Sequence, residues 1–362
     1  MNGTLLRTAL TVAATGTLLA ALAGCSDAPA ESSSDKPETA ASTFLPCIAA
    51  NVGGVADRSF NQLNRAGMQS AADALDGEMK GVESRTQDDY AGNLASLAGQ
   101  GCSVIEAVGF DMAADTQAAA KENTDVDYLM VDATLSDADG QEVTLPNVKP
   151  MLFETGAPSY LAGYLAAGTT TSGKVGVYGG IQIPPVTAFM DGFAQGVAAY
   201  NEAHDAEVEV VGWDVEKQDG LFVGNFEDAN AARSLSENMF SQGVDVIMPV
   251  AGGLFSGTAE AIKDSGEDIA LIGVNDDGYE VAPEYAGMFL TSVLKNMAVA
   301  TEDVVTEIAD NGFDNTTYLG TITNNGVGIA PYHDWDAKVS DELKAEVADL
   351  QQQFVDGDLT LS

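Results

Sequence analysis

Asn51-Val-Gly-Gly-Val-Ala-Asp-Arg-Ser-Phe-Asn-Gln62 stands at the centre of the stretch that decides the fold, residues 44–75. The apolar run before it predicts a buried strand, and two glycines end that strand. Ser59, with Gln62 three residues later, predicts a capping box at the start of a helix. This unit of strand, loop and helix is typical of a parallel sheet, whose ligands bind beyond the carboxyl ends of the strands. The loop, residues 51–60, is therefore the expected position of a small ligand.

Strand-like and helix-like segments alternate through the rest of the chain. This alternation predicts a parallel sheet with right-handed crossovers for residues 44–132. A second run of the same kind begins near residue 149. The sequence therefore predicts an α/β protein with two doubly wound lobes and, between them, a cleft that suits a small polar ligand.

The N-terminus has the features of a lipoprotein leader. A weakly basic start with Arg7 precedes an apolar stretch, residues 8–23, and then Leu22-Ala-Gly-Cys25. A run of small residues that ends at a cysteine is a lipobox, in which the thiol of Cys25 receives a diacylglyceryl group and Cys25 becomes the new N-terminus. The alternatives are an ordinary secretory signal or a short membrane span, for which the apolar run is short. Residues 1–24 are thus a predicted signal peptide, and residues 25–43 a predicted disordered tether.

The chain is strongly acidic, with 55 acidic and 15 basic residues and a net charge of -40. A field of this sign repels nucleic acids and anionic lipid headgroups, so neither is an expected partner. The two histidines, His204 and His333, provide little material for a histidine-rich metal site or a histidine-based nucleophile.

Besides Cys25, two cysteines remain, Cys47 and Cys102, and each belongs to an apolar, strand-like run. In an oxidising compartment an even remainder suggests a disulfide between neighbouring strands, while two buried free thiols are the alternative.

Motifs along the chain carry a family resemblance. They are Ala56-Asp-Arg-Ser-Phe-Asn-Gln62, Val108-Gly-Phe110, Tyr160-Leu-Ala-Gly-Tyr-Leu-Ala-Ala167, Gly192-Phe193, Gly273-Val274 and Thr291-Ser-Val-Leu-Lys-Asn296. In this order they resemble the basic membrane protein family of lipoproteins, which are the purine-nucleoside-binding, substrate-binding subunits of ABC transporters. The resemblance covers nearly everything after Phe44.

The resemblance implies the type I periplasmic-binding-protein fold, with three hinge crossovers near Glu154, Asn275 and Thr323. Lobe 1 would then comprise residues 44–154 and about 276–322, and lobe 2 residues 155–275 and about 323–362. Closure of the two lobes over the ligand is the expected motion.

The family holds its purine ring between two aromatic side chains, and the resemblance places Phe60 in one of these positions. Phe226 is the candidate for the other. Stacking suits a heterocycle, because every base has a π-face. The structural alternatives are packing of Phe60 at the start of a helix and burial of Phe226 in the core.

Polar candidates complete the expected site. Asn61 and Asp132 match the hydrogen-bonding groups of a base edge, although Asp132 is equally compatible with a turn after a strand. Lys295 is expected to hold ribose hydroxyls, with a structural salt bridge as the alternative. Gly252 would let the backbone approach the ligand, and Phe110 belongs to the Val-Gly-Phe motif.

The sequence departs from the family pattern at three positions. Asn51 and Asn275 stand where the family usually has aspartate, and Ala157 fills a position that is usually acidic. Replacing a carboxylate by an amide removes charge and adds donors. The ligand is therefore expected to be a nucleoside, with a modified nucleoside or a related compound as the alternative.

Three functions compete at this point. The first is a lipid-anchored, monomeric binding protein that faces outside the cell membrane and delivers nucleosides to an ABC permease and ATPase. The second is a receptor of the same fold for a sugar or another small polar signal. The third is a secreted hydrolase that uses Asp276 and Asp277, but no nucleophile with a paired base is visible, so we expect no enzyme.

Overall fold

The computed structural model of the protein describes residues 44–361. The predicted signal peptide, Cys25 and the tether lie outside this range, so the lipid anchor remains a prediction. Within the range, no helix combines the length and the apolar character that a membrane crossing requires.

Lobe 1 is built on a six-stranded parallel sheet with the order β15-β7-β4-β3-β1-β2. Helices α2 and α3 pack on one face of this sheet, and α1 and α9 pack on the other. The bounds are β1 (Pro46–Ala50), β2 (Lys80–Glu83), β3 (Val104–Val108), β4 (Asp127–Val131), β7 (Val148–Phe153), β15 (Tyr318–Gly320), α1 (Phe60–Ala74), α2 (Tyr90–Gly99), α3 (Ala113–Glu122) and α9 (Met297–Asn311). A short hairpin, β5 (Leu135–Ser136) and β6 (Glu142–Val143), and two 3₁₀ turns, η1 (Gln87–Asp89) and η2 (Phe110–Met112), complete lobe 1.

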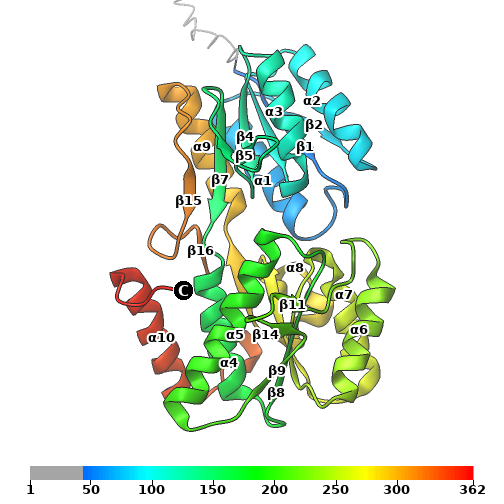
Figure 1. The fold of residues 1–362 in the computed structure, drawn as a ribbon, viewed down its shortest axis with the longest axis vertical. Helices are drawn as coiled ribbons and strands as arrows, with labels where there is room; N and C mark the ends of the chain where they lie inside the picture. Colours follow the sequence, from blue (N-terminus) through cyan, green and yellow to red (C-terminus); the bar gives the residue numbers. More distant parts are fainter. Residues whose placement is uncertain (1–43, 362) are drawn as a thin grey trace, which may run out of the picture. The chain divides into compact units, whose positions relative to one another are not determined.

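Lobe 2 is built on a second six-stranded sheet with the order β16-β14-β13-β12-β8-β9, parallel except for the edge strand β16. Figure 1 shows α4 and α5 on one side of this sheet and α6 and α7 on the other. The bounds are β8 (Lys174–Gly179), β9 (Glu209–Val211), β12 (Val246–Val250), β13 (Ala270–Asn275), β14 (Phe289–Lys295), β16 (Val327–Ile329), α4 (Gly156–Thr169), α5 (Pro184–His204), α6 (Ala229–Ser241), α7 (Phe255–Ser265) and α10 (Asp341–Asp356). Shorter elements are β10 (Trp213–Asp214), β11 (Asp219–Gly220), α8 (Gly278–Val281), η3 (Gly252–Leu254), η4 (Pro283–Met288) and η5 (His333–Trp335).

The chain passes three times between the two sheets, which confirms the predicted two-lobed α/β architecture. The crossings follow β7, β14 and β15. The expected crossing near Asn275 is wrong, because β14 pairs in parallel with β13 and stays in the lobe 2 sheet. The second crossing therefore follows Lys295, and lobe 1 regains the chain only at α9, which packs against α1.

A disulfide joins Cys47 of β1 to Cys102, two residues before β3. This confirms the predicted pairing of the two cysteines. The bond links two neighbouring strands of lobe 1, and one of them, β1, leads into the loop at residues 51–60.

Glycines bring α4 and α5 into close contact in lobe 2. A Cβ atom at Gly163 would lie 2.0 Å from the carbonyl oxygen of Phe193, and one at Gly196 would lie 2.0 Å from that of Tyr160. Any larger residue at these positions would push the helices apart. This contact fixes the position of α5, whose first turn reaches the cavity described below.

One buried carboxyl group in lobe 1 has only one hydrogen-bond partner. Glu106, in the middle of β3, is 0% exposed, and the hydroxyl of Thr301 in α9 donates to its Oε1 atom at 2.6 Å. Its Oε2 atom is buried without a partner. Burial raises the pKa of Glu106 to about 8, and the Thr301 hydrogen bond opposes this rise.

We expect Glu106 to make lobe 1 less stable as the pH rises. Below pH 4.5 the carboxyl is protonated in both the folded and the unfolded chain, whereas between pH 4.5 and about 8 only the unfolded chain releases the proton. The free energy of unfolding then falls by up to about 1.4 kcal/mol per pH unit. Glu106→Gln should remove this slope in urea unfolding, and Glu142→Gln on an exposed strand should not. A stability difference between wild type and Glu106→Gln that stays constant with pH would contradict the assignment.

Candidate ligand-binding site

A cavity of about 480 Å³ lies between the two lobes, at the carboxyl ends of strands from both sheets. Its walls include residues at or just beyond the ends of β1, β3 and β4 in lobe 1 and of β8, β12, β13 and β14 in lobe 2. This is the place where open α/β sheets bind ligands. All the residues predicted to bind the ligand line this cavity: Asn51, Phe60, Asn61, Phe110, Asp132, Phe226, Gly252, Asn275 and Lys295.

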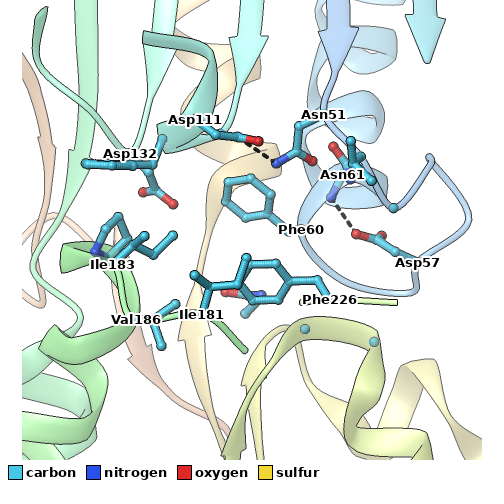
Figure 2. A pocket seen from close by; sticks show the side chains of 18 of the residues that line it. Asn51, Asp57, Phe60, Asn61, Asp111, Asp132, Ile181, Ile183, Val186 and Phe226 are labelled. Carbon is cyan, nitrogen blue, oxygen red and sulfur yellow. Dashed lines mark hydrogen bonds between the residues drawn. The ribbon is translucent and has the colours of Figure 1, made fainter. Parts of the chain in front are cut away.

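The two candidate stacking rings come from different lobes. Phe60 is the first residue of α1, and Phe226 lies in the loop before α6, which begins only after the N-cap residue Asp228. Figure 2 shows the two rings one above the other across the cavity. Phe226 rests on the backbone of Gly180, where a Cβ atom would lie 2.1 Å from its ring.

Asp57 caps the helix that presents Phe60. Its carboxylate accepts backbone hydrogen bonds from Ser59 at 3.0 Å, Asn61 at 2.9 Å and Gln62 at 3.1 Å. Burial raises the pKa of Asp57, and these backbone donors oppose the rise. The predicted capping box of Ser59 and Gln62 is wrong, because the Ser59 side chain makes no capping hydrogen bond.

The Ser59 hydroxyl contacts lobe 2 instead. It accepts a hydrogen bond from Nδ2 of Asn275 at 2.8 Å, and both side chains are buried. Beside it, Arg58 pairs with Glu284 of lobe 2. The carbonyl oxygen of Asp57 lies so close to Gly253 that a Cβ there would be 2.4 Å away. Three consecutive residues of the β1–α1 loop therefore touch lobe 2.

Lys295 and Asp132 form a buried ion pair on the wall of the cavity. The Nζ atom of Lys295 lies 2.5 Å from the carboxylate of Asp132, and the two side chains are 3% and 9% exposed. Nζ also lies over the ring of Phe60, 4.9 Å from its centroid, a distance typical of cation–π contacts. Burial lowers the pKa of Lys295, and the Asp132 carboxylate opposes this. Lys295 ends β14 in lobe 2 and Asp132 follows β4 in lobe 1, so the pair also joins the two sheets.

A second polar group surrounds Asp111, which the sequence analysis did not single out. Its carboxylate accepts hydrogen bonds from Tyr90 at 2.5 Å, Gln87 at 3.3 Å and Asn51 at 3.4 Å. Burial of Tyr90 and its hydrogen bond to Asp111 raise the pKa of Tyr90. The hydrogen bond from Asn51 to Asp111 orients the Asn51 amide, because it turns Nδ2 toward the carboxylate. Asp111 directly follows the Val-Gly-Phe motif, which was the available sequence signal.

Two amide oxygens at the cavity have no partner. Asn61 is 2% exposed, and its Oδ1 atom is buried without a hydrogen bond, as is Oδ1 of Asn51. A buried polar atom without a partner costs about 1–3 kcal/mol. A ligand with hydrogen-bond donors at this end of the cavity would lower that cost.

Of the other positions named from the sequence, Gly252 lines the cavity, whereas Ala157, Asp276 and Asp277 do not. Gly252 has φ +55, a backbone conformation that favours glycine, and it contributes to the cavity wall. Ala157, the third departure from the family pattern, lies in the first turn of α4 and packs on the lobe 2 core, outside the cavity lining. Asp276 and Asp277, the carboxylates of the hydrolase hypothesis, are also outside the lining: Asp277 caps α8 and bonds to His333.

An apolar wall from lobe 2 was not predicted. One segment, the end of the β8–α5 loop and the first turns of α5, contributes Ile181, Ile183, Pro185, Val186 and Phe189. Its signal in the sequence was the density of apolar residues before a helix. Within residues 44–361, no group of three or more His, Cys, Asp or Glu side chains is arranged to hold a metal ion.

Comparison with known proteins identifies the family of the chain. Residues 48–357 match the family described as ABC transporter substrate-binding protein PnrA-like. The chain belongs to this family. It is therefore a substrate-binding protein of an ABC transporter and not an enzyme.

Among curated relatives, the CD4+ T-cell-stimulating antigen of Listeria innocua is 29% identical, with 96% of this chain and 95% of the relative covered. The ABC transporter nucleoside-binding protein BmpA of Lactococcus lactis is 28% identical, with 95% of both chains covered. A solved solute-binding protein of an ABC transporter system from Aeropyrum pernix superimposes with a TM-score of 0.78 over 88% of this chain and 93% of that one. The two sequences are 22% identical, so this superposition shows a shared fold alone.

We expect Lys295 and Asp132 to contribute to stability only as a pair. Lys295→Met leaves the carboxylate of Asp132 buried without its partner, and breaking a buried pair in this way costs about 3–5 kcal/mol of stability. The double variant Lys295→Met/Asp132→Asn should recover a large part of the loss, because asparagine tolerates the φ of +66 at this position.

Chemical denaturation of the single and double variants tests this expectation. The exposed pair Lys338–Asp268 is a matched control, since Lys338→Met should change stability by less than about 1 kcal/mol. Equal losses in the single and double variants of the buried pair would show that the two charges are not coupled.

Proposed function

We propose that this substrate-binding protein captures purine nucleosides, or closely related nucleosides, between its two lobes. The observation that carries the proposal is the pair of rings, Phe60 from lobe 1 and Phe226 from lobe 2, on opposite sides of one cavity. A flat heterocycle between them would gain about 1–3 kcal/mol per stacked ring. The name of the Lactococcus relative, a nucleoside-binding protein, supports the same ligand class.

The polar groups of the cavity suit a ligand that is rich in donors. The lining contains the carboxylates of Asp57, Asp111, Asp132 and Glu227, and its one positive side chain, Lys295, is already paired. Ribose hydroxyls and exocyclic amino groups donate to such acceptors. An uncharged nucleoside therefore fits the charge of the cavity.

The arrangement also suggests how the ligand lies. In our proposal Asn61 faces the base edge, as the sequence analysis expected, because its unpaired Oδ1 lies beside Phe60 at the start of α1. Asp132 was expected at the base edge too, but its bond to Lys295 groups it with the ribose side. The remaining lone pairs of Asp132 and the protons of Lys295 would hold the ribose hydroxyls.

The cellular setting is part of the proposal. We propose that lipid on Cys25 anchors a monomer to the cell membrane, outside the cytoplasm, and that the protein hands its ligand to the ABC permease and ATPase subunits. The support is the Cys25 lipobox in the sequence and the membership of an ABC transporter family.

Isothermal titration tests the ligand class. The full-length protein, purified in detergent, should bind at least one of adenosine, guanosine and inosine more tightly than cytidine and should bind ribose weakly or not at all, because ribose has no ring for Phe60 and Phe226. Binding of ribose without binding of any nucleoside would instead favour the sugar-receptor hypothesis.

Phe60→Ala should weaken nucleoside binding by about tenfold or more, because one of the two stacking faces is lost. The ring also packs at the edge of the lobe 1 core, so a matched control is needed. Phe313→Ala removes a ring from the edge of the same core without touching the cavity. It should lower the melting temperature with unchanged affinity. If Phe60→Ala lowers only the melting temperature, Phe60 is a packing residue.

A further inference from the structure

We infer that the cavity takes a nucleoside whose 5′ substituent is uncharged and apolar, such as an alkylthio group, and rejects one with a 5′ phosphate. This inference rests on the proposed function and concerns the lobe 2 wall, which that function does not explain. The wall is formed by Ile181, Ile183, Pro185, Val186 and Phe189.

The first turn of α5 presents no free backbone donor to the cavity. Helix N-termini at this place in α/β proteins normally bind anions through unpaired N–H groups. Here the first two helical residues, Pro184 and Pro185, have no N–H group. The next two donors, the N–H groups of Val186 and Thr187, both bond to the carbonyl oxygen of Ile183, at 2.9 Å and 3.0 Å. A phosphate at this wall would find no hydrogen bond from the helix.

Two donors just before the helix are also already paired. The N–H group of Ile183 bonds to the carbonyl oxygen of Ile181, and the amide nitrogen of Gln182 bonds to the carbonyl oxygen of Gln218, outside the cavity lining. The charged side chains of the lining are four carboxylates and one lysine that is already paired with Asp132. A ligand phosphate at this wall would thus meet repulsion from the carboxylates and find no donor in the first turn of α5.

The position of the wall identifies the part of the ligand that meets it. Figure 2 shows Ile183 and Val186 on the opposite side of the cavity from Asp132, and Ile181 next to Phe226. With the base between the rings and the ribose hydroxyls at Asp132 and Lys295, the ribose end faces Ile183 and Val186. Its 5′ carbon carries the substituent that can extend along this wall.

Apolar surface is left open at the same cavity. Ile181 of lobe 2 is 36% exposed, and Phe110 of lobe 1 is 37% exposed. Covering such surface is favourable in proportion to the apolar area that leaves water. A 5′ hydroxyl group cannot provide this area, whereas a methylthio group can.

Titration of matched ligands tests the inference on the full-length protein in detergent. The three ligands share the base that binds tightest and differ only at the 5′ carbon: a hydroxyl, a methylthio group or a phosphate. We expect the methylthio compound to bind at least as tightly as the parent nucleoside and at least a hundredfold more tightly than the 5′ phosphate. Weaker binding of the methylthio compound than of the parent, or a smaller preference over the phosphate, overturns the inference.

A substitution in the wall provides a second, independent measurement. Ile183→Ser removes an apolar side chain that packs at the edge of the lobe 2 core and adds a hydroxyl at the N-cap, a position where serine favours the helix. The preference for methylthio over phosphate should fall at least tenfold. The control Leu221→Ser changes an exposed apolar residue of lobe 2 outside the lining and should leave the preference unchanged. Equal preferences in wild type and Ile183→Ser contradict the role of the wall.

The outcomes separate the two proposals. If no nucleoside binds, the proposed function fails and this inference fails with it. If the parent nucleoside binds but the order of the 5′ derivatives is reversed, the proposed function stands and only the inference is overturned.

Discussion

The hydrogen bonds that the Asp57 carboxylate accepts from the N–H groups of Ser59, Asn61 and Gln62 organise the site. They fix the start of α1, so that Phe60 and Asn61 face the cavity while Ser59 is free to bond to Asn275. Because Asp57 is partly buried, its charge is disfavoured, and these donors offset part of that cost. One acidic side chain thus positions Phe60, Asn61 and a contact between the lobes.

The second constraint is charge balance within the cavity. Lys295 is buried between Asp132 and two aromatic rings, those of Phe60 and Phe153, and so contributes little net charge to its surroundings. The other ionised side chains of the lining are carboxylates. In a chain with a net charge of -40, the cavity continues the acidic character of the whole molecule.

The sequence predicted those features that depend on local pattern. Alternating strands and helices predicted both sheets, and motif positions at strand ends brought Asn51, Asp132 and Lys295 to one cavity. The sequence could not predict which side chain caps α1. Ser59 and Asp57 are both good N-cap residues, and only tertiary packing against Asn275 decides between them. The second crossing was misplaced because the resemblance put it near Asn275, whereas the chain continues from β13 through α8 to β14 within the same lobe. The proline-blocked start of α5 was visible in the sequence, but its importance appears only once the cavity is seen.

The crossing after β14 has a consequence for the order of events in capture. Lys295 is the last residue of lobe 2 before the chain returns to lobe 1, so it lies beside the pivot of any rotation of one lobe against the other. Displacement in a rotation grows with distance from the axis, and Lys295 therefore moves little, whereas the pair of Arg58 and Glu284 joins the β1–α1 loop to η4, neither of which is a crossing segment. We expect a ligand to meet the pivot end of the cavity in nearly its final geometry, while the contacts at the outer edge form afterwards. Recognition would then precede enclosure.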